Sequence, residues 1–241
     1  MIEVIQSLED VVDEVCLGIN GAASACQAAI QQQLPAVRVY SIEWQGYGKT
    51  KNELALLASN TWILSVDSDE LANDDLRQYL SNNPKLEPDT VYRVRRINYL
   101  GSDKIRFGTW GRSDRKITRL YEKDKARWSE DQVHESLVIN TMKTRQIPGA
   151  LHHLTAGSLE QVMYKNKKYA LYFSEQMRHL EKQYPIWKKY TSAFFAFIKS
   201  YIWRLGFLDG RVGWQLAMAI AKYSYWKYDW VRHPPGPFHS S

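Results

Sequence analysis

Residues 1–72 alternate stretches of helical periodicity with short apolar runs, and this alternation limits the folds open to the chain more than any other feature. Apolar residues recur with helical spacing over residues 2–12, 22–34 and 52–59. Bulky apolar residues typical of strands occupy residues 15–17, 37–40 and 62–66. Because helices that alternate with strands favour a parallel sheet, the sequence predicts an α/β body in this part of the chain.

The pattern changes from strands to helices near Ala156. Further strands are expected over residues 90–99, 117–121 and 133–139, and helices over residues 159–182, 186–204 and 213–230. The Pro and Gly residues that follow His233 are typical of a frayed chain end. The sequence therefore divides into an α/β domain of residues 1–156, a basic and aromatic helical extension of residues 157–232, and a flexible tail of residues 233–241.

Three carboxylates follow the apolar run that begins at Trp62. Ligands of open α/β sheets bind outside the carboxyl ends of the strands, where Asp67, Asp69 and Glu70 would stand. Asp67 and Asp69 could both reach one hard cation, whose other ligands would be water and phosphate oxygens. A solvated acidic turn is one alternative. An aspartate-based phosphotransferase is another, but such a site usually has Thr at the position of Leu71.

The composition limits the partners and the setting of the chain. Its 241 residues carry a net charge of +6 and a pI near 9.1, which indicates an anionic partner: a phosphate-bearing substrate, an anionic membrane surface or a nucleic acid. The 9 Trp and 15 Tyr residues suit sugar-binding clefts and membrane interfaces. Cys16 and Cys26 lack metal-site spacing, and free thiols are typical of a reducing, cytoplasmic setting. We expect no signal peptide and no membrane span.

Landmarks along nearly the whole chain resemble family 2 glycosyltransferases, in particular the branch that contains lipopolysaccharide core β-glucosyltransferases. They follow the family's order: Trp44-Gln45-Gly46-Tyr47-Gly48 with Lys51-Asn52, residues 62–70, Arg119-Leu120-Tyr121, Val133-His134-Glu135, His153-Leu154-Thr155, Gly206-Phe207-Leu208-Asp209-Gly210, Tyr223, and Lys227-Tyr228. The resemblance implies a GT-A fold, with a Rossmann-like sheet that binds a nucleotide sugar, and inversion at the anomeric carbon of the sugar.

The resemblance also implies a metal site. Asp67 and Asp69 would hold Mg²⁺ or Mn²⁺, which neutralises the departing diphosphate. Asp69 is expected to be the direct ligand, whereas Asp67 could instead face the ribose or a metal-bound water. His153 corresponds to a family position that contacts the metal or the diphosphate, with His152 beside it as a competing candidate.

Basic and amide side chains are expected around the donor. Lys51 would pair with a phosphate, and Asn52 stands next to it; an exposed lysine and a helix-capping Asn are the alternatives. Arg119 and the basic segment Arg112–Lys116 could meet the diphosphate or a phosphorylated acceptor, although charge runs commonly stay solvated. Trp110 could stack on a sugar or pack within the protein.

The resemblance implies that Glu135 is the general base that takes a proton from the acceptor hydroxyl. Asp131 is the reserve candidate for this base. His134 could orient the base or contact the acceptor, or it could make an ordinary hydrogen bond within a strand.

Two departures from the family concern the nucleoside end of the site. Family members usually begin with a strand that ends in a Thr-Lys-Asn-Glu-like segment, and this chain starts after that point. The family's next strand normally ends in Asp-Ser-Gly-Ser-Thr-Asp, where this chain has Ile-Asn-Gly-Ala-Ala-Ser at residues 19–24. Without the first strand, we expect free sheet edges and exposed apolar surface.

The helical extension combines aromatic and basic residues. Aromatic and aliphatic side chains fill the stretch from Phe194 to Trp203, which also contains Lys199 and is followed by Arg204. This combination is typical of an interfacial helix on an anionic leaflet. The aromatic core of a helical subdomain is an equal alternative.

Together these features predict a metal-dependent, inverting glycosyltransferase that moves a hexose, glucose from UDP-glucose, onto a lipopolysaccharide core or related lipid-linked surface glycan. It would work at the cytoplasmic, inner face of the plasma membrane. A catalytically inactive GT-A-like protein that binds a membrane surface is the alternative, and the two departures favour it. The hypothesis of a nucleic-acid-binding function is supported by the positive charge alone, so we expect no nucleic-acid partner.

Overall fold

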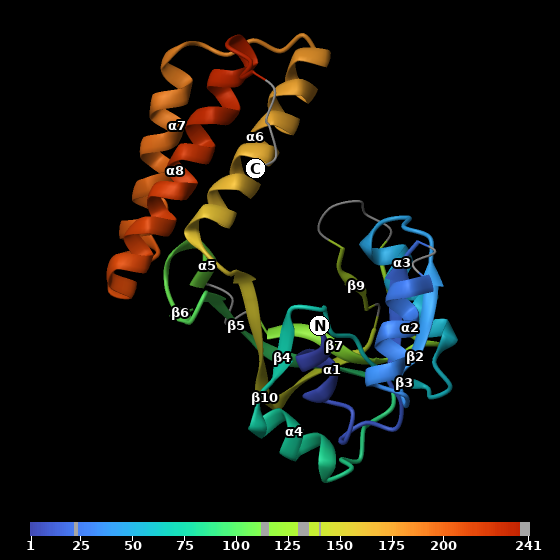
Figure 1. The fold of residues 1–241 in the computed structure, drawn as a ribbon. Coiled ribbons are helices and arrows are strands. Elements are labelled where there is room, and N and C mark those ends of the chain that lie inside the picture. Colours follow the sequence, from blue (N-terminus) through green and yellow to red (C-terminus); the bar gives the residue numbers. More distant parts are fainter. Residues whose placement is uncertain (22–23, 112–115, 130–134, 140, 237–241) are drawn as a thin grey trace. The chain divides into compact units, whose positions relative to one another are not determined.

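The computed structural model describes residues 1–21, 24–111, 116–129, 135–139 and 141–236, and its chain forms two compact units (Figure 1). The first unit comprises residues 1–96 and 115–153, and the second comprises residues 97–114 and 154–241. Two strands, β5 (Thr90–Leu100) and β10 (Lys143–Ala156), run from one unit into the other. The expected combination of an α/β body with C-terminal helices is confirmed.

A six-stranded sheet contains most strands of the first unit. Its order is β3-β7-β5-β10-β4, with β6 paired to β5. The strand pairs β3–β7, β7–β5, β5–β6 and β10–β4 are antiparallel. The strands not yet given bounds are β3 (Trp62–Leu64), β4 (Glu70–Ala72), β6 (Asp103–Ile105) and β7 (Lys116–Glu122).

The expected parallel sheet is found only in a separate two-stranded sheet. There β1 (Cys16–Asn20) pairs in parallel with β2 (Arg38–Ile42), and α2 (Ser24–Gln33) connects them. The prediction that β3 continues this parallel sheet is wrong, because β3 pairs with β7 instead. Local periodicity identifies a strand but does not reveal which strand lies beside it, and the partner of β3 comes from much later in the chain.

A cavity of the first unit lies beside β1 and β3, each of which has one strand partner in the described residues. In the described residues, β1 pairs only with β2, and β3 pairs only with β7. This cavity of about 470 Å³ is lined by both strands, by α1 (Ile2–Gln6), and by Lys51 and Asp67. The cavity extends to the residues at the end of β3, where it is lined by Ser65, Val66, Asp67 and Ser68.

The core of the first unit lies between the sheet and α4 (Asp74–Ser81). It is formed by Leu76, Tyr92, Val94, Leu120, Ile147 and Leu151. Asn73 begins α4, because its side-chain oxygen accepts hydrogen bonds from the backbone N–H groups of Leu76 (3.1 Å) and Ala150 (2.8 Å). Gly149, with φ of 85°, lies against the backbone of Leu76, where a Cβ would not fit.

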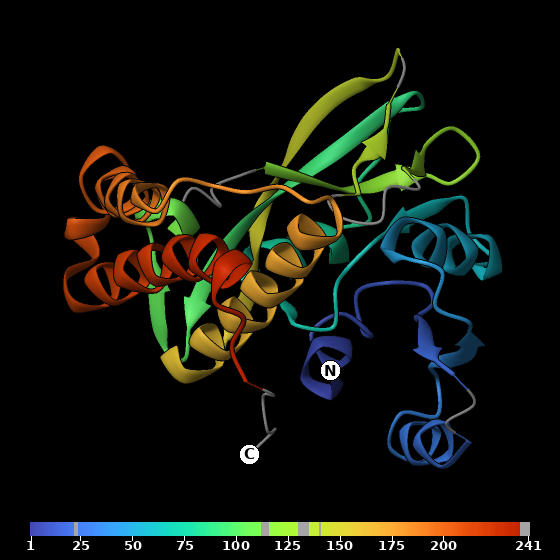
Figure 2. The ribbon, with the colours of Figure 1, turned by 90° about the horizontal axis from the view of Figure 1, so that it is seen from above.

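The second unit is built on three long helices: α6 (Leu159–His179), α7 (Trp187–Ile198) and α8 (Gly210–Arg232). Figures 1 and 2 show α8 beside both α6 and α7. Between α7 and α8 lie a π-helical turn, η1 (Lys199–Trp203), and a 3₁₀ turn, η2 (Gly206–Asp209). None of the helices in the described part of the chain is both long and apolar enough to cross a membrane.

Asp209 holds the two residues that precede the short helix α5 (Gly108–Gly111), which also belongs to the second unit. The carboxylate of Asp209 accepts the backbone N–H groups of Arg106 (3.0 Å) and Phe107 (2.8 Å). Trp110 is partly buried against the cluster that contains Leu100 and Leu216, so it packs in this core. Asp209, one of the family-like landmarks, therefore has a structural role in the second unit.

Candidate functional site

The turn after β3 holds Asp67 between two basic side chains. One carboxylate oxygen of Asp67 lies 2.9 Å from Nζ of Lys51, and the other lies 2.6 Å from a terminal nitrogen of Arg119. Lys51 comes from α3 (Tyr47–Leu57), and Arg119 comes from β7. The pairing of β3 with β7 continues through Ser65, whose N–H donates to the Arg119 carbonyl at 2.8 Å. The antiparallel pair therefore brings Arg119 to the Asp67 turn.

Glu70 anchors this turn from below the surface. It is fully buried, and its carboxylate lies 2.6 Å from Arg119 and 3.7 Å from Arg96. The other carboxylate oxygen accepts the backbone N–H of Asp67 at 3.3 Å. The alternative of a solvated loop residue is therefore wrong for Glu70. A buried carboxylate with charged partners is costly to disturb, so the ion pair fixes the shape of the turn.

The paired charges set the ionisation of the site. Burial alone would raise the pKa of Asp67, but the charges of Arg119 and Lys51 and their hydrogen bonds outweigh it and lower this pKa to about 2. Burial would lower the pKa of Arg119, but Glu70 and Asp67 raise it above its ordinary value. At neutral pH, Asp67 is therefore an anion held between two cations.

Asp69 and His153 form the second pair of the site. Nε2 of His153 lies 3.3 Å from a carboxylate oxygen of Asp69, whose side chain is 49% exposed. The pairing of β4 with β10 places His153 opposite Glu70, one residue after Asp69. Burial tends to raise the pKa of Asp69, but the hydrogen bond and charge of His153 outweigh it, so this pKa is lowered. His152 lies opposite Leu71 instead.

Lys51 connects the turn to Glu135. Its Nζ lies 3.0 Å from the Glu135 carboxylate and 4.5 Å from the centre of the Trp128 ring. Trp128 is buried in β8 (Arg127–Trp128), which pairs with β9 (Leu137–Val138). The cluster thus contains a contact that the sequence analysis missed, because no local pattern distinguishes Trp128 from any other buried tryptophan.

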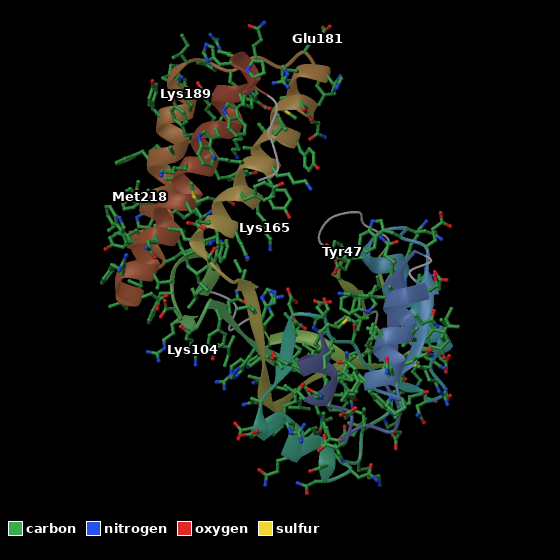
Figure 3. The ribbon with its side chains drawn as sticks, viewed as in Figure 1. Tyr47, Lys104, Lys165, Glu181, Lys189 and Met218 are labelled. Atoms are coloured by element: carbon green, nitrogen blue, oxygen red, sulfur yellow. The ribbon has the colours of Figure 1, made fainter. Side chains whose placement is uncertain are left out.

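Asn52 and Gly48 hold α3 against this strand. The Asn52 amide donates to the Trp128 carbonyl at 2.9 Å and accepts the Trp128 N–H at 2.8 Å. Gly48 lies against the backbone carbonyl of Ser129, where a Cβ would overlap with it. Tyr47 lies at the beginning of the same helix (Figure 3). Both polar atoms of the Asn52 side chain are thus used to position the Lys51 helix.

Several expected site residues lie outside the described residues. These are Asp131, the reserve base, together with Glu130 and His134, and residues 112–115 of the basic segment. Among the described residues, the structure brings Lys51, Asp67, Arg119 and Glu135 into one chain of contacts. It also brings His153 of β10 to Asp69, which lies on the turn after β3.

Among the residues that the structure describes, the site offers two side-chain ligands for a divalent cation, and it also offers unpaired hydrogen-bond donors for an anionic ligand. In the described part of the chain, no group of three or more His, Cys, Asp or Glu residues could hold a metal. Asp69 and His153 offer two ligands, whereas both oxygens of Asp67 are already paired with cations. Among the described residues, the buried Nε atoms of Arg96 and Arg119 have no hydrogen-bond partner. Such donors can serve an anionic ligand or water.

Comparison with known proteins gives distant relatives. No protein-family model matches the chain. The chain is 26% identical to an uncharacterized glycosyltransferase of Rickettsia prowazekii over 236 aligned residues, which cover 91% of this chain and 78% of that protein. It is 25% identical, with the same coverage, to an uncharacterized glycosyltransferase of Rickettsia typhi. The similarity includes most of both units.

Proposed function

We propose that this chain is a glycosyltransferase of the family 2 type, with a GT-A fold, that transfers a hexose with inversion. The donor would be a nucleotide sugar, UDP-glucose, and the acceptor a lipopolysaccharide core or related lipid-linked surface glycan. The observation that carries the proposal is the turn after β3, where Asp67 and Asp69 stand beside Lys51, Arg119 and His153. The distant similarity to two uncharacterized glycosyltransferases supports the same reaction class.

Asp69 and His153 are the residues that would hold Mg²⁺ or Mn²⁺. Their side chains lie 3.3 Å apart, and Asp69 is half exposed, so water and diphosphate oxygens could complete the shell of the metal. A carboxylate suits either ion, and the imidazole favours the transition metal Mn²⁺. Bound there, the cation would supply Lewis-acid neutralisation of the leaving diphosphate.

Lys51 and Arg119 provide the fixed positive charge of the site. Both are already paired with Asp67, so they would stabilise added phosphate charge without a large movement of side chains. The unpaired Nε of Arg119 supports a role beside an anion. Asp67, anionic at neutral pH, would accept hydrogen bonds from donor hydroxyls or from a metal-bound water.

Glu135 would act on the acceptor. Its carboxylate takes the proton of an acceptor hydroxyl while that oxygen forms a bond to the anomeric carbon of the sugar. The bond from this carbon to the diphosphate oxygen breaks on the opposite side, and the nucleoside diphosphate leaves with the electron pair. Lys51, 3.0 Å from Glu135, would link the base to the donor side of the site.

Release of UDP from UDP-glucose tests the proposal at its metal site. With Mn²⁺, Asp69→Asn should lower release of UDP by at least about a hundredfold, because the amide is a much weaker metal ligand. Asp74→Asn, at an exposed aspartate in the first turn of α4, is the matched control and should retain activity. Release that persists with chelator, or equal losses in both variants, would contradict the metal assignment.

A catalytically inactive GT-A-like protein that binds a membrane surface is the competing candidate, because both oxygens of Asp67 are already paired and, in the described residues, β1 pairs only with β2. Calorimetric titration with UDP and Mn²⁺ separates the two. Binding with measurable turnover supports the transferase. Neither binding nor turnover, with a broad set of acceptors, supports the inactive protein.

A further inference from the structure

Helix α7 is apolar and yet has no buried residue. Its sequence, Trp-Lys-Lys-Tyr-Thr-Ser-Ala-Phe-Phe-Ala-Phe-Ile, contains four aromatic rings between Tyr190 and Phe197, and none of its residues is buried. By contrast, the neighbouring α8 buries Leu216, Ala217 and Ala219. A surface helix normally turns its apolar stripe towards the core. Phe197 contacts the rings of Tyr201 and Trp214, each at 5.2 Å between centroids, so the aromatic residues of α7 are packed in part and exposed in part.

The exposed apolar residues continue from α7 through the turns into α8. We define the hairpin face as Phe194, Phe195, Trp203, Phe207, Leu208 and Trp214, whose exposed fractions range from 43% to 68%. Tyr201 links three elements of this face, because its ring contacts those of Phe207 and Trp214 at centroid distances of 6.2 and 5.3 Å. The residues of the face come from the end of α7, from the two turns and from the beginning of α8, and these segments lie at one end of the α7–α8 pair (Figures 1 and 2). Large exposed apolar patches mark interaction sites.

The same segment contains the excess positive charge of the chain. Residues 186–232 hold eight Lys and Arg residues and two acidic ones, whereas the whole chain holds 32 and 26. Both acidic residues already have partners: Asp209 binds the backbone of residues 106 and 107, and Asp229 lies 2.6 Å from Lys189 (labelled in Figure 3). Lys199 and Arg211, close in sequence to the hairpin-face residues, are exposed. The face is therefore aromatic, and two exposed basic residues lie within four residues of its members in the sequence.

We propose that the hairpin face binds the surface of an anionic lipid bilayer. Its Trp side chains would lie at the level of the lipid headgroups, where amphipathic aromatic residues are favoured, and its Phe and Leu side chains would lie at the boundary with the acyl chains. Lys199 and Arg211 would meet the anionic phosphates, which attract basic residues near a membrane surface. This proposal goes beyond the transfer reaction and does not depend on it, because it concerns the second unit alone.

Co-sedimentation of the whole chain with vesicles tests the proposal. We expect binding to vesicles of phosphatidylcholine mixed with phosphatidylglycerol, weaker binding to phosphatidylcholine alone, and loss of binding at about 1 M salt, where charges are screened beyond roughly 3 Å. The double variant Phe194→Ser with Trp203→Ser should reduce partition onto the mixed vesicles by at least about tenfold. Both residues are well exposed, so the fold should be retained, and circular dichroism checks it.

A matched control uses equally exposed aromatic residues elsewhere in the second unit. Tyr169 and Tyr172 on α6 are 59% and 52% exposed, and changing both to Ser should leave vesicle binding unchanged. Equal loss in this control, or no binding of the unmodified chain to either vesicle, would overturn the proposal. So would a dimer in sedimentation velocity that Phe194→Ser with Trp203→Ser dissociates, because the face would then be an interface between copies of the chain.

Discussion

Lys51 occupies the position where the two ends of the candidate site meet. It lies 2.9 Å from Asp67, 3.0 Å from Glu135 and above the ring of Trp128. Because Lys51 lies between the two carboxylates, each of them stays close to a positive charge while the other contacts a substrate. The roles of Asp67 and Glu135 can therefore be separated only by changes that leave Lys51 in place.

The first prediction at the residue scale concerns Glu135. Glu135→Gln keeps the size of the side chain but loses its basicity, so glucosyl transfer should fall by at least about a hundredfold. Donor affinity should change little, because Lys51 still has Asp67 as a partner. Transfer rates and UDP binding measured in the same preparation check this. Glu53→Gln, at an exposed position of α3, is the control. If Asp131→Asn abolished transfer while Glu135→Gln left it unchanged, Asp131 would be the base.

The second prediction concerns the stability that Asp67 contributes. Its pKa is about 2 in the folded chain and 3.8 ordinarily, so its ion pairs stabilise the fold above pH 3.8. This contribution is lost as the pH falls through about 2. The difference corresponds to about 2.5 kcal/mol, which we reduce to about 1 kcal/mol because the side chain is 35% exposed.

Urea unfolding at about pH 5 and about pH 2.5 measures this contribution. Asp67→Asn should reduce the difference in unfolding free energy between the two pH values by about 0.7 kcal/mol, because part of the contribution remains at about pH 2.5, above the folded-state pKa. Asp74→Asn, which lacks such partners in the described structure, should leave the difference nearly unchanged. The same pH dependence in the wild type and in Asp67→Asn would show that these ion pairs contribute no net stability.

At the scale of elements, close backbone approach positions α3 and α4. Gly48 allows α3 to lie against the carbonyl of Ser129, and Gly149 allows β10 to lie against the backbone of Leu76. At both glycines, even the single methyl group of an alanine would overlap with the opposing backbone. Since α3 carries Lys51 and β10 carries His153, both glycines act on the site through the helices and strands that hold it.

The prediction at this scale compares two glycines with similar backbone angles. Gly149→Ala and Gly21→Ala both introduce a Cβ at positive φ, 85° and 79°. Among the residues that the structure describes, only the Cβ at Gly149 meets another residue. We expect Gly21→Ala to cost about 1 kcal/mol and Gly149→Ala at least about 2 kcal/mol more, because overpacking adds to backbone strain. Urea unfolding of the two variants checks this. Equal costs would mean that β10 can move away from α4 without loss.

At the scale of the whole molecule, the two units share continuous strands. β5 and β10 each begin in the first unit and end in the second, so the chain passes twice between the units as a β-strand. The similarity to the two Rickettsia proteins likewise extends over 91% of the chain. Both units are therefore included in the similarity, and the same two strands contribute to both.

The prediction at this scale concerns cooperativity of unfolding. Because two strands cross between the units, we expect a single calorimetric transition in which the calorimetric and van't Hoff enthalpies agree. Asp67→Asn should shift this transition as a whole. Two resolved transitions, with only one of them moved by the variant, would show that the units unfold independently despite the shared strands.

The sequence by itself determined the features that depend on neighbouring residues. The strand before Asp67, the acidic turn, the helices after residue 158 and the basic, aromatic character of α7 all follow from local spacing and composition. The tertiary structure decided which segments meet: β3 with β7, Arg119 with the buried Glu70, and Lys51 with Trp128. It also decided that Phe194 and Phe195 of α7 remain exposed. Pairing and burial depend on residues far apart in the chain, and local periodicity carries no information about those partners.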